Sequence, residues 1–486
     1  MRVPRLAIAF LALGAALVVP ASADALSLPQ ATALALPTPN NGLDQGYLPF
    51  QSCSSVGNCA VTGMYLNAQS VDAGVFEDEV KGVWQTPVTA AIPLGGDTSK
   101  SVTMNGVSCP ANNSCVAVGQ YVTAVKNKTV TNVNEHVFVA SQLGGVWQRG
   151  VALALPSNAM TSSEVAIPHA ITCASAGNCT VVGTYTTDST VFATDGFLAS
   201  EVKGVWHQAV ELALPRGANA NPFVSLSQVA CWSGGNCTAV GSYLDTNNVA
   251  HALIVPELSG SWRRGLSLSL PANASAFAGA SLNEVTCTTN GSCLALGSFN
   301  TVSGAVQPLV ALSTSGRWSG LQVRLPHAAR NPEALTFGFD GVACASPGNC
   351  AFGGQFLDAN GRYQGFLDNV VNGFVQPAQV LALPSGALQA GHNGGVVSLS
   401  CPAVGQCVAG AAFINAAKNY EGLVVSETNG VWSPGQVIAL PSGAVSVGVG
   451  GGVYSAQCFS TSACQLTGSY LATATRYEGF TLLTSA

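Results

Sequence analysis

Sixteen cysteines recur along the chain as eight pairs, and five residues separate the two cysteines of every pair. From one pair to the next, the first cysteines lie 56, 64, 58, 56, 57, 57 and 57 residues apart. A period this regular is typical of a repeat protein, and it outweighs the roughly three domains that ~150 residues per domain would give. The pairs are Cys53/Cys59, Cys109/Cys115, Cys173/Cys179, Cys231/Cys237, Cys287/Cys293, Cys344/Cys350, Cys401/Cys407 and Cys458/Cys464.

Each unit carries the same four β-rich segments. A short run ends in the first cysteine, as at Val107-Ser108-Cys109, and a second strand follows the second cysteine, as from Val116 to Tyr121. An apolar third strand comes next, as from Val137 to Ala140, and a fourth runs from a Gly-x-Trp turn to Leu-Pro, as from Gly145 to Pro156. Four short antiparallel strands punctuated by glycine and proline form one blade, so the sequence predicts an all-β, eight-bladed β-propeller.

The two ends of the chain favour a closed ring. The eighth unit stops after its third strand, Phe480 to Leu483, and the missing fourth strand has its match near the N-terminus, from Ala31 to Pro37. We expect this N-terminal strand to complete the last blade, which removes two sheet edges. A linear β-solenoid needs no complementary end pieces, and no sustained helical period supports helical repeats.

The first 23 residues are typical of a secretory signal peptide. Arg2 and Arg5 precede an apolar run of 14 residues from Leu6 to Val19, and Ala21-Ser22-Ala23 forms a small-residue cleavage site. As a helix this run rises only ~21 Å, short of the ~30 Å hydrocarbon core, which disfavours an uncleaved membrane anchor. We expect a secreted, extracellular protein in which residues 24–486 form a single propeller domain and no segment spans a membrane.

In a secreted chain, this cysteine spacing predicts eight local disulfides. Turn-forming residues fill most of the intervals, as from Pro110 to Ser114, so each pair is expected at the end of a hairpin. Zinc thiolates are the alternative. They favour C-x2-4-C spacing, often with histidine, and no histidine lies in these intervals.

In these repeats the chain resembles the secreted bacterial β-propellers that are built from tandem Cys-x5-Cys blades. The resemblance covers Leu34 to Leu483 and implies the fold. It implies no particular activity, because propellers include both binding modules and enzymes.

Composition excludes several classes of protein. Charged residues make up only 8% of the chain and hydrophobic residues 48%, which excludes a disordered chain and a coiled coil. The 17 basic residues are outnumbered by 23 acidic ones and form no cluster, so we expect no nucleic-acid partner.

Known catalytic motifs do not appear. Sialidase propellers carry S-x-D-x-G-x-x-W turns, but the turn from Ser426 to Trp432 lacks the aspartate and has one residue too few before the tryptophan. There is no G-x-S-x-G or H-E-x-x-H motif. His169 with Cys173 and His207 with Glu211 give two potential ligands each, short of the usual three or four. The sequence predicts no catalytic residue, no metal site and no cofactor.

One polar position recurs two residues before the first large apolar side chain of the third strand. Blade one has Gly74 there, and the polar residues of the other seven blades are His136, Asp195, His251, Gln307, Gln364, Glu421 and Glu478. We expect this position to share one face with the variable blade-to-blade connections, and the cysteine hairpins and Gly-x-Trp turns to share the other. The seven residues are predicted either to gather around the axis as a ligand-binding ring or simply to begin a strand at solvent.

The first hypothesis for function is a non-catalytic, monomeric propeller that binds an extracellular protein, glycan or cell-wall polymer through its long-loop face. An extracellular hydrolase or lyase acting on glycans is the alternative, with carboxylates such as Glu421 and Glu478 near a central funnel. A structural component of the cell envelope is the third hypothesis, favoured by the low charge and the eight staples.

Overall fold

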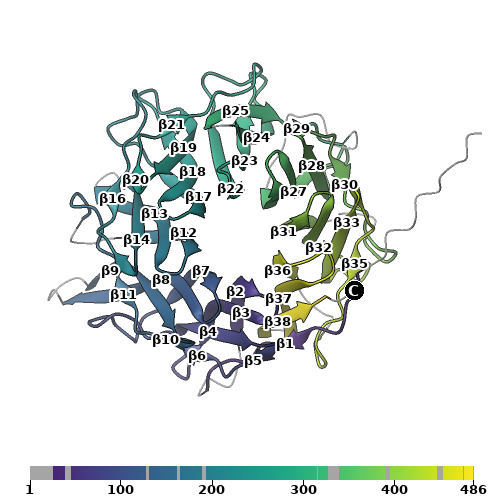
Figure 1. Ribbon diagram of the computed structural model, residues 1–486, viewed down its shortest axis with the longest axis horizontal. Helices are drawn as coiled ribbons and strands as arrows, with labels where there is room; N and C mark the ends of the chain where they lie inside the picture. Colours follow the sequence, from purple (N-terminus) through teal and green to yellow (C-terminus); the bar gives the residue numbers. More distant parts are fainter. Residues whose placement is uncertain are drawn as a thin grey trace, which may run out of the picture.

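The computed structural model describes residues 26–38, 45–126, 131–160, 165–188, 193–314, 316–326, 339–388, 394–445, 452–473 and 476–484. The predicted signal peptide and its cleavage site lie outside these residues. The described strands form eight antiparallel sheets that stand as blades around a central axis, in chain order (Figure 1). The prediction of an all-β, eight-bladed propeller is therefore confirmed.

Each blade begins at the axis and proceeds outward. The innermost strands are β2 (Gly46–Ser55), β7 (Thr103–Ala111), β12 (Ala166–Ser175), β17 (Ser225–Ser233), β22 (Ala280–Cys287), β26 (Phe339–Ser346), β31 (Gly395–Ala403) and β36 (Gly452–Cys458). The second strands are β3 (Asn58–Leu66), β8 (Ser114–Lys126), β13 (Asn178–Asp188), β18 (Asn236–Leu244), β23 (Cys293–Asn300), β27 (Asn349–Leu357), β32 (Gln406–Ile414) and β37 (Cys464–Thr473). The third strands are β4 (Asp72–Val80), β9 (Thr131–Leu143), β14 (Ala193–Val202), β19 (Ala250–Leu258), β24 (Val306–Thr314), β28 (Tyr363–Val371), β33 (Tyr420–Thr428) and β38 (Arg476–Leu483). We number the blades 1 to 8 in this order.

The fourth strand differs from the continuous strand that we predicted, because in six blades it is broken into two short pieces. These pairs are β5 (Val83–Trp84) and β6 (Val88–Thr89), β10 (Val146–Trp147) and β11 (Val151–Ala152), β15 (Val205–Trp206) and β16 (Val210–Glu211), β20 (Ser261–Trp262) and β21 (Leu266–Ser267), β29 (Phe374–Val375) and β30 (Gln379–Val380), and β34 (Val431–Trp432) and β35 (Gln436–Val437). Blade 5 has the single strand β25 (Arg317–Gln322). Between the pieces the chain bonds to the preceding blade, as where the Gly150 N–H donates to the Ala91 carbonyl at 2.7 Å. The break thus ties each outer strand to two blades.

The N-terminal strand closes the ring as predicted. β1 (Thr32–Ala33) pairs with β38, and the register places Thr32 opposite Thr481 and Ala33 opposite Phe480. The Ala31 N–H also donates to the Ala439 carbonyl of blade 7 at 2.8 Å, which repeats the tie seen between other blades. The first and last parts of the described chain therefore build one sheet.

The hydrophobic core lies between the blades, so the middle strands are buried on both faces. The tryptophan turns pack blades together, as at Trp147, whose ring stacks on Phe76 of the preceding blade with centroids 4.0 Å apart. The second strands each contribute one aromatic residue to this packing. All eight are buried: Tyr65, Tyr121, Tyr185, Tyr243, Phe299, Phe356, Phe413 and Tyr470.

All eight predicted disulfides are present, one within each blade. They are Cys53–Cys59, Cys109–Cys115, Cys173–Cys179, Cys231–Cys237, Cys287–Cys293, Cys344–Cys350, Cys401–Cys407 and Cys458–Cys464. Each joins the innermost strand to the second strand, and Cys53 and Cys59, for example, lie directly opposite each other in the register. Eight disulfides indicate an oxidising compartment. Among the described residues, no helix is long and apolar enough to cross a membrane.

The second cysteine of each pair is buried, although a residue at the end of a hairpin is usually exposed. The eight second cysteines are all buried: Cys59, Cys115, Cys179, Cys237, Cys293, Cys350, Cys407 and Cys464. Seven of them, all except Cys59, belong to the hydrophobic clusters between blades. The turn residues predicted only the hairpin position. The innermost and second strands pack against neighbouring blades along their length as far as the cysteines, so the cysteines are buried as well. The disulfides therefore form part of the core as well as closing the hairpins.

One face of the ring, which we call the stapled face, carries the cysteine hairpins and the Gly-x-Trp turns. In blade 1 the Gly82 N–H of the tryptophan turn donates to the Gly57 carbonyl of the hairpin at 2.9 Å, and blades 3, 4, 6 and 7 repeat this bond. Gly57 has a φ of 69°, and a Cβ there would lie 2.8 Å from the Gly82 nitrogen, so this contact requires glycine. The predicted sharing of one face by these two turns is confirmed.

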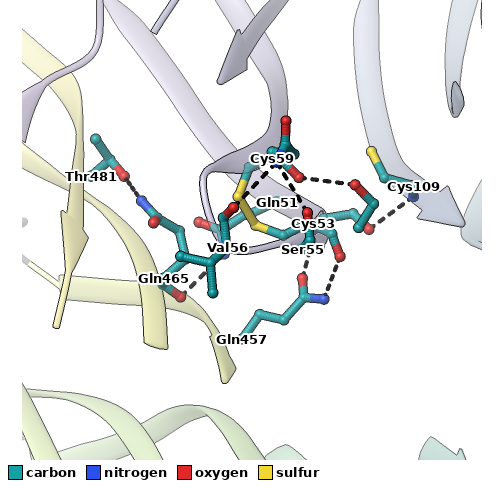
Figure 2. Close-up of a disulfide and its surroundings, with 12 residues drawn as sticks. Gln51, Cys53, Ser55, Val56, Cys59, Cys109, Gln457, Gln465 and Thr481 are labelled. Carbon is teal, nitrogen blue, oxygen red and sulfur yellow. Dashed lines mark hydrogen bonds between the residues drawn. A yellow bond between two sulfur atoms is a disulfide. The ribbon is translucent and has the colours of Figure 1, made fainter. Parts of the chain in front are cut away.

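Hydrogen bonds also join neighbouring hairpins across the stapled face, including the seam between blade 8 and blade 1 (Figure 2). At the next seam, the Cys109 N–H donates to the Ser52 hydroxyl at 2.9 Å. At the closing seam, Gln457 replaces that serine, accepts from the Cys53 N–H at 2.8 Å and donates to the Cys53 carbonyl at 2.7 Å. Gln457 therefore binds both backbone groups of its partner where the ring closes.

The opposite face, which we call the long-loop face, carries the turns between second and third strands and the blade-to-blade connections. The connections pack on the next blade, as where the Asn219 N–H donates to the Leu244 carbonyl at 2.9 Å. Asp97 with Val122 and Leu388 with Ile414 repeat this contact. The predicted grouping of the two kinds of loop on one face is confirmed.

Candidate functional site

The seven polar residues predicted as a ring occupy one structural position, but they lie on the third strands, two strands out from the axis. Each is the cross-strand partner of a second-strand aromatic: Tyr121 pairs with His136, Tyr185 with Asp195, Tyr243 with His251, Phe299 with Gln307, Phe356 with Gln364, Phe413 with Glu421 and Tyr470 with Glu478. The expectation that they gather around the axis is wrong. In blade 1, the register places Ala73 opposite Tyr65, so the assignment of Gly74 is wrong by one residue.

Three of these residues fasten the turn that precedes them. Nε2 of His251 lies 3.1 Å from Oδ2 of Asp245, whose other oxygen accepts two backbone N–H groups of the turn. Gln364 donates to Asp358 at 3.1 Å, and the Asn415 amide donates to Glu421 at 2.6 Å. A polar residue here therefore has a local purpose, which is to hold the start of the third strand against an Asx turn.

The other four also have neighbours within their own blades. His136 lies 2.8 Å from the Thr123 hydroxyl, and Gln307 accepts from Gln322 at 3.1 Å. Glu478 pairs with Arg476 at 2.7 Å and accepts a hydrogen bond from Tyr470. Burial, with a smaller contribution from the charge of Glu211, raises the pKa of Asp195 to about 6. The seven residues are thus distributed one per blade.

A cavity of about 620 Å³ opens on the long-loop face at the seam between blade 8 and blade 1, and we call it the seam pocket. Its aromatic walls are Tyr47 on β2, Tyr454 on β36 and Tyr477 on β38, and Asp72 at the start of β4 also lines it. Tyr47 and Tyr454 meet edge to face across the seam, with ring centroids 5.4 Å apart and planes at 74°. Its volume lies in the range of small-molecule sites.

The seam pocket departs from the repeat. On the innermost strand, blade 1 has Tyr47 at the position that faces the residue before the second-strand aromatic. Blades 2, 4 and 7 have Thr103, Ser225 and Gly395 there, and blade 3 has Ile167. Tyr454 stands at a β-bulge that recurs in the innermost strands, where blade 2 has Asn105. Bulges commonly redirect a side chain near a functional site. At the closing seam, both positions therefore carry a tyrosine.

The sequence alone does not identify this site. Tyr477 was visible as an aromatic next to Glu478, but Tyr47 and Tyr454 lie far apart in the sequence and meet because the ring closes. The available signal was a comparison of units upstream of each cysteine, which shows an aromatic residue at two positions where other units have residues such as Thr103 and Asn105.

A smaller cavity of about 280 Å³ opens between blades 7 and 8 on the same face. Glu421 lines it together with Tyr420, Ile438, Pro441 and Leu471. Of the seven predicted residues, Glu421 is therefore one that borders an open cavity.

Three cavities on the stapled face have a different character, because they repeat at equivalent places between adjacent blades. Their volumes are about 310, 420 and 390 Å³ between blades 3 and 4, 5 and 6, and 6 and 7. Disulfides and glycine turns line each of them. Burial raises the pKa of Glu201, Glu257 and Glu427, which border these crevices. Recurrence from blade to blade makes these crevices a product of blade packing.

Within the described ranges, no three His, Cys, Asp or Glu side chains are grouped so that they could hold a metal ion. The eight disulfides account for every cysteine, and the structure gives no support to the zinc-thiolate alternative.

Comparisons with known proteins do not assign a family. No family model matches the chain, and no curated protein matches it. Among solved structures, a protein of unknown function from Dyadobacter fermentans aligns with 66% of this chain and 97% of its own, at 11% identity and a TM-score of 0.38. An ulvan lyase from a new polysaccharide lyase family covers 82% and 98% of the two chains at 11% identity and a TM-score of 0.43. A microbial sialidase covers 74% of each chain at 9% identity and a TM-score of 0.37. Likenesses this distant carry no argument about activity.

Proposed function

We propose that this chain is a secreted, non-catalytic propeller that binds an extracellular protein, glycan or cell-wall polymer through its long-loop face. The observation that carries the proposal is the seam pocket, where the repeated scaffold gives way to a cavity with three tyrosine walls on that face. We also propose that the chain is one of the secreted bacterial propellers with tandem Cys-x5-Cys blades, which it resembles.

The contrast between the two faces supports this assignment. On the stapled face, hairpins and turns of uniform length bond to one another, and the crevices repeat from blade to blade. On the long-loop face, the connections vary in length and both irregular cavities open there. Variable loops on a rigid scaffold are the usual location of binding specificity.

The face assignment is tested with two matched double variants of the full mature protein. Phe277→Lys with Val302→Lys adds two charges to the long-loop face, and Phe374→Lys with Val83→Lys adds two to the stapled face. All four side chains are exposed, so neither pair is expected to disturb the core. Purified cell-wall fractions and a glycan array serve as probes. We expect weaker or altered binding from the first pair and unchanged binding from the second, and the reverse result would overturn the proposal.

A glycan-active hydrolase or lyase is the second candidate, and the position of Glu421 at the smaller cavity is the observation that favours it. Its test is incubation of the protein with each polymer that it binds, followed by measurement of new reducing ends or unsaturated sugars. Product that disappears in Glu421→Gln would establish the enzyme, whereas binding without product favours the non-catalytic module.

A further inference from the structure

The tyrosines of the seam pocket combine apolar surface with hydrogen-bonding groups. Tyr47 and Tyr477 are 41% and 38% exposed, which leaves ring surface open to a ligand. The hydroxyl of Tyr454 lies 2.9 Å from that of Ser469, at the wall of the same cavity. Tyrosine supplies a large, rigid surface and a polar tip, so such a wall suits a ligand with both apolar and hydroxylated faces.

The floor of the pocket is fixed by the blade itself. Tyr65 is buried, and its hydroxyl lies 2.7 Å from that of Thr89 on the outer strand. Tyr454 meets Tyr47 from the other side of the seam, so each ring limits the motion of the other. A site whose rings are held in this way loses little conformational entropy when a ligand binds.

The charge of the residues that line the pocket indicates which ligands it can bind. Among the described residues that line the pocket, Asp72 carries the charge, and no lysine or arginine takes part. An anionic ligand would therefore meet a carboxylate without a compensating cation. A neutral sugar meets no such penalty, because its C–H face can lie on a tyrosine ring while its hydroxyls donate to the carboxylate of Asp72.

We propose that the seam pocket is a binding site for a neutral saccharide, held between the tyrosines of blade 1 and blade 8. This inference rests on the proposed function and specifies the ligand class for the long-loop face. Because Tyr47 belongs to blade 1 and Tyr454 and Tyr477 to blade 8, the ligand bridges the closing seam and is expected to stabilise the ring by mass action.

The test uses an array of neutral oligosaccharides of glucose, galactose, mannose and N-acetylglucosamine, read with the full mature protein. Glycans that bind are then titrated by calorimetry. Tyr47→Ala and Tyr477→Ala are each expected to weaken binding at least tenfold. Phe374→Ala is the matched control, since it removes an exposed aromatic on the stapled face, outside the pocket, and is expected to leave binding unchanged. Tyr47→Phe, which keeps the ring, is expected to retain most of the affinity, and melting curves show that each variant is folded.

The outcomes separate this inference from the proposed function. Binding that survives both tyrosine-to-alanine changes but is lost in Phe277→Lys with Val302→Lys would overturn the seam pocket and leave the long-loop face in place. Binding of choline, or of uronic acids, in place of neutral sugars would overturn the ligand class. Absence of any neutral-glycan binding by the wild-type protein would overturn the inference as well, and loss of binding through the stapled-face variants would overturn the proposed function.

Discussion

Trp147 shows how one side chain joins two blades. Its ring stacks on Phe76 of the preceding blade, and its Nε1–H donates to both oxygens of Asp78 at 3.2 and 3.0 Å. Gln142 donates to the same carboxylate at 2.9 Å. Burial raises the pKa of Asp78 to about 6, and these two donors limit the rise.

Replacing Trp147 by phenylalanine tests the polar part of this contact. The stacked ring remains, but the Asp78 carboxylate loses one of its donors, which should cost about 1–3 kcal/mol where the carboxylate is ionised. Losing the donor also raises the pKa of Asp78 further, so the melting temperature should fall more near pH 8 than near pH 5. Val146→Ala, at the exposed neighbouring residue, should change little. Equal melting curves for Trp147→Phe and the wild type at both pH values would contradict this account.

The polar position of the third strand was predictable from the sequence, but its distance from the axis of the ring was not. Aligning the units on the third strand placed His251 and Glu421 at the same level of their blades, and the register confirms that level. Distance from the axis depends on which strand is innermost, and contacts such as Asn415 with Glu421 depend on turn geometry. Both follow from the folded ring, so the alignment of units could not supply them.

Among the elements, β1 is short but closes the ring, since its two paired residues complete the last blade. Next to it, the Ala35 N–H donates to the buried carboxylate of Glu77 in blade 1 at 3.4 Å. On the stapled face, Gln457 secures the same seam. The closure is thus held at the outer edge and at the hairpins.

Deletion of residues 31–37 should expose the outer edge of β38 and the core around Phe480. We expect a lower melting temperature and aggregation, because an uncovered strand edge pairs readily with other chains. Gln457→Ala tests closure with a smaller change, and it should destabilise more than Ser400→Ala, which removes a single bond to Cys458 at the preceding seam. An unchanged melting temperature for the deletion variant would show that β1 does not close the ring in solution.

Glu77 gives the closing seam a dependence on pH. Burial raises the pKa of Glu77 from 4.5 to about 8, the Ala35 N–H opposes the rise and Asp78 adds to it. Between these values, the folded protein keeps a proton that the unfolded chain has released, so stability falls as pH rises. Glu77→Gln should therefore lose less melting temperature than the wild type between about pH 5 and about pH 8. Asp97→Asn is the control, because hydrogen bonds from Ser99 lower the pKa of this carboxyl and it stays ionised across the range. Equal losses in Glu77→Gln and the wild type would contradict the assignment.

Most of the element order was predictable from the sequence because the period, the cysteine pairs and the Leu-Pro signals all report local structure. The incomplete eighth unit and its match from Ala31 to Pro37 even predicted the closing strand. The break in the fourth strand was not predictable, because it arises from a bond such as that of Gly150 with Ala91 in another blade. The seam pocket escaped prediction for the same reason, since Tyr47 and Tyr454 meet across the closure.

At the scale of the whole molecule, the two faces of the ring have different roles. The stapled face repeats its hairpins, disulfides and crevices around the ring and provides rigidity. The long-loop face carries the irregular features, namely the variable connections, the seam pocket and the cavity at Glu421. In this account, recognition depends on the long-loop face and on a ring that is closed.

Hydrogen–deuterium exchange of the wild-type protein tests this claim most directly. Exchange is compared with and without a glycan or cell-wall fraction that the binding screen has recovered. The account predicts slower exchange in the long-loop turns at the seam, around residues 45–47 and 66–72, with no change in the hairpin tips at 54–58 and 110–114. Slower exchange confined to the hairpin tips would contradict it.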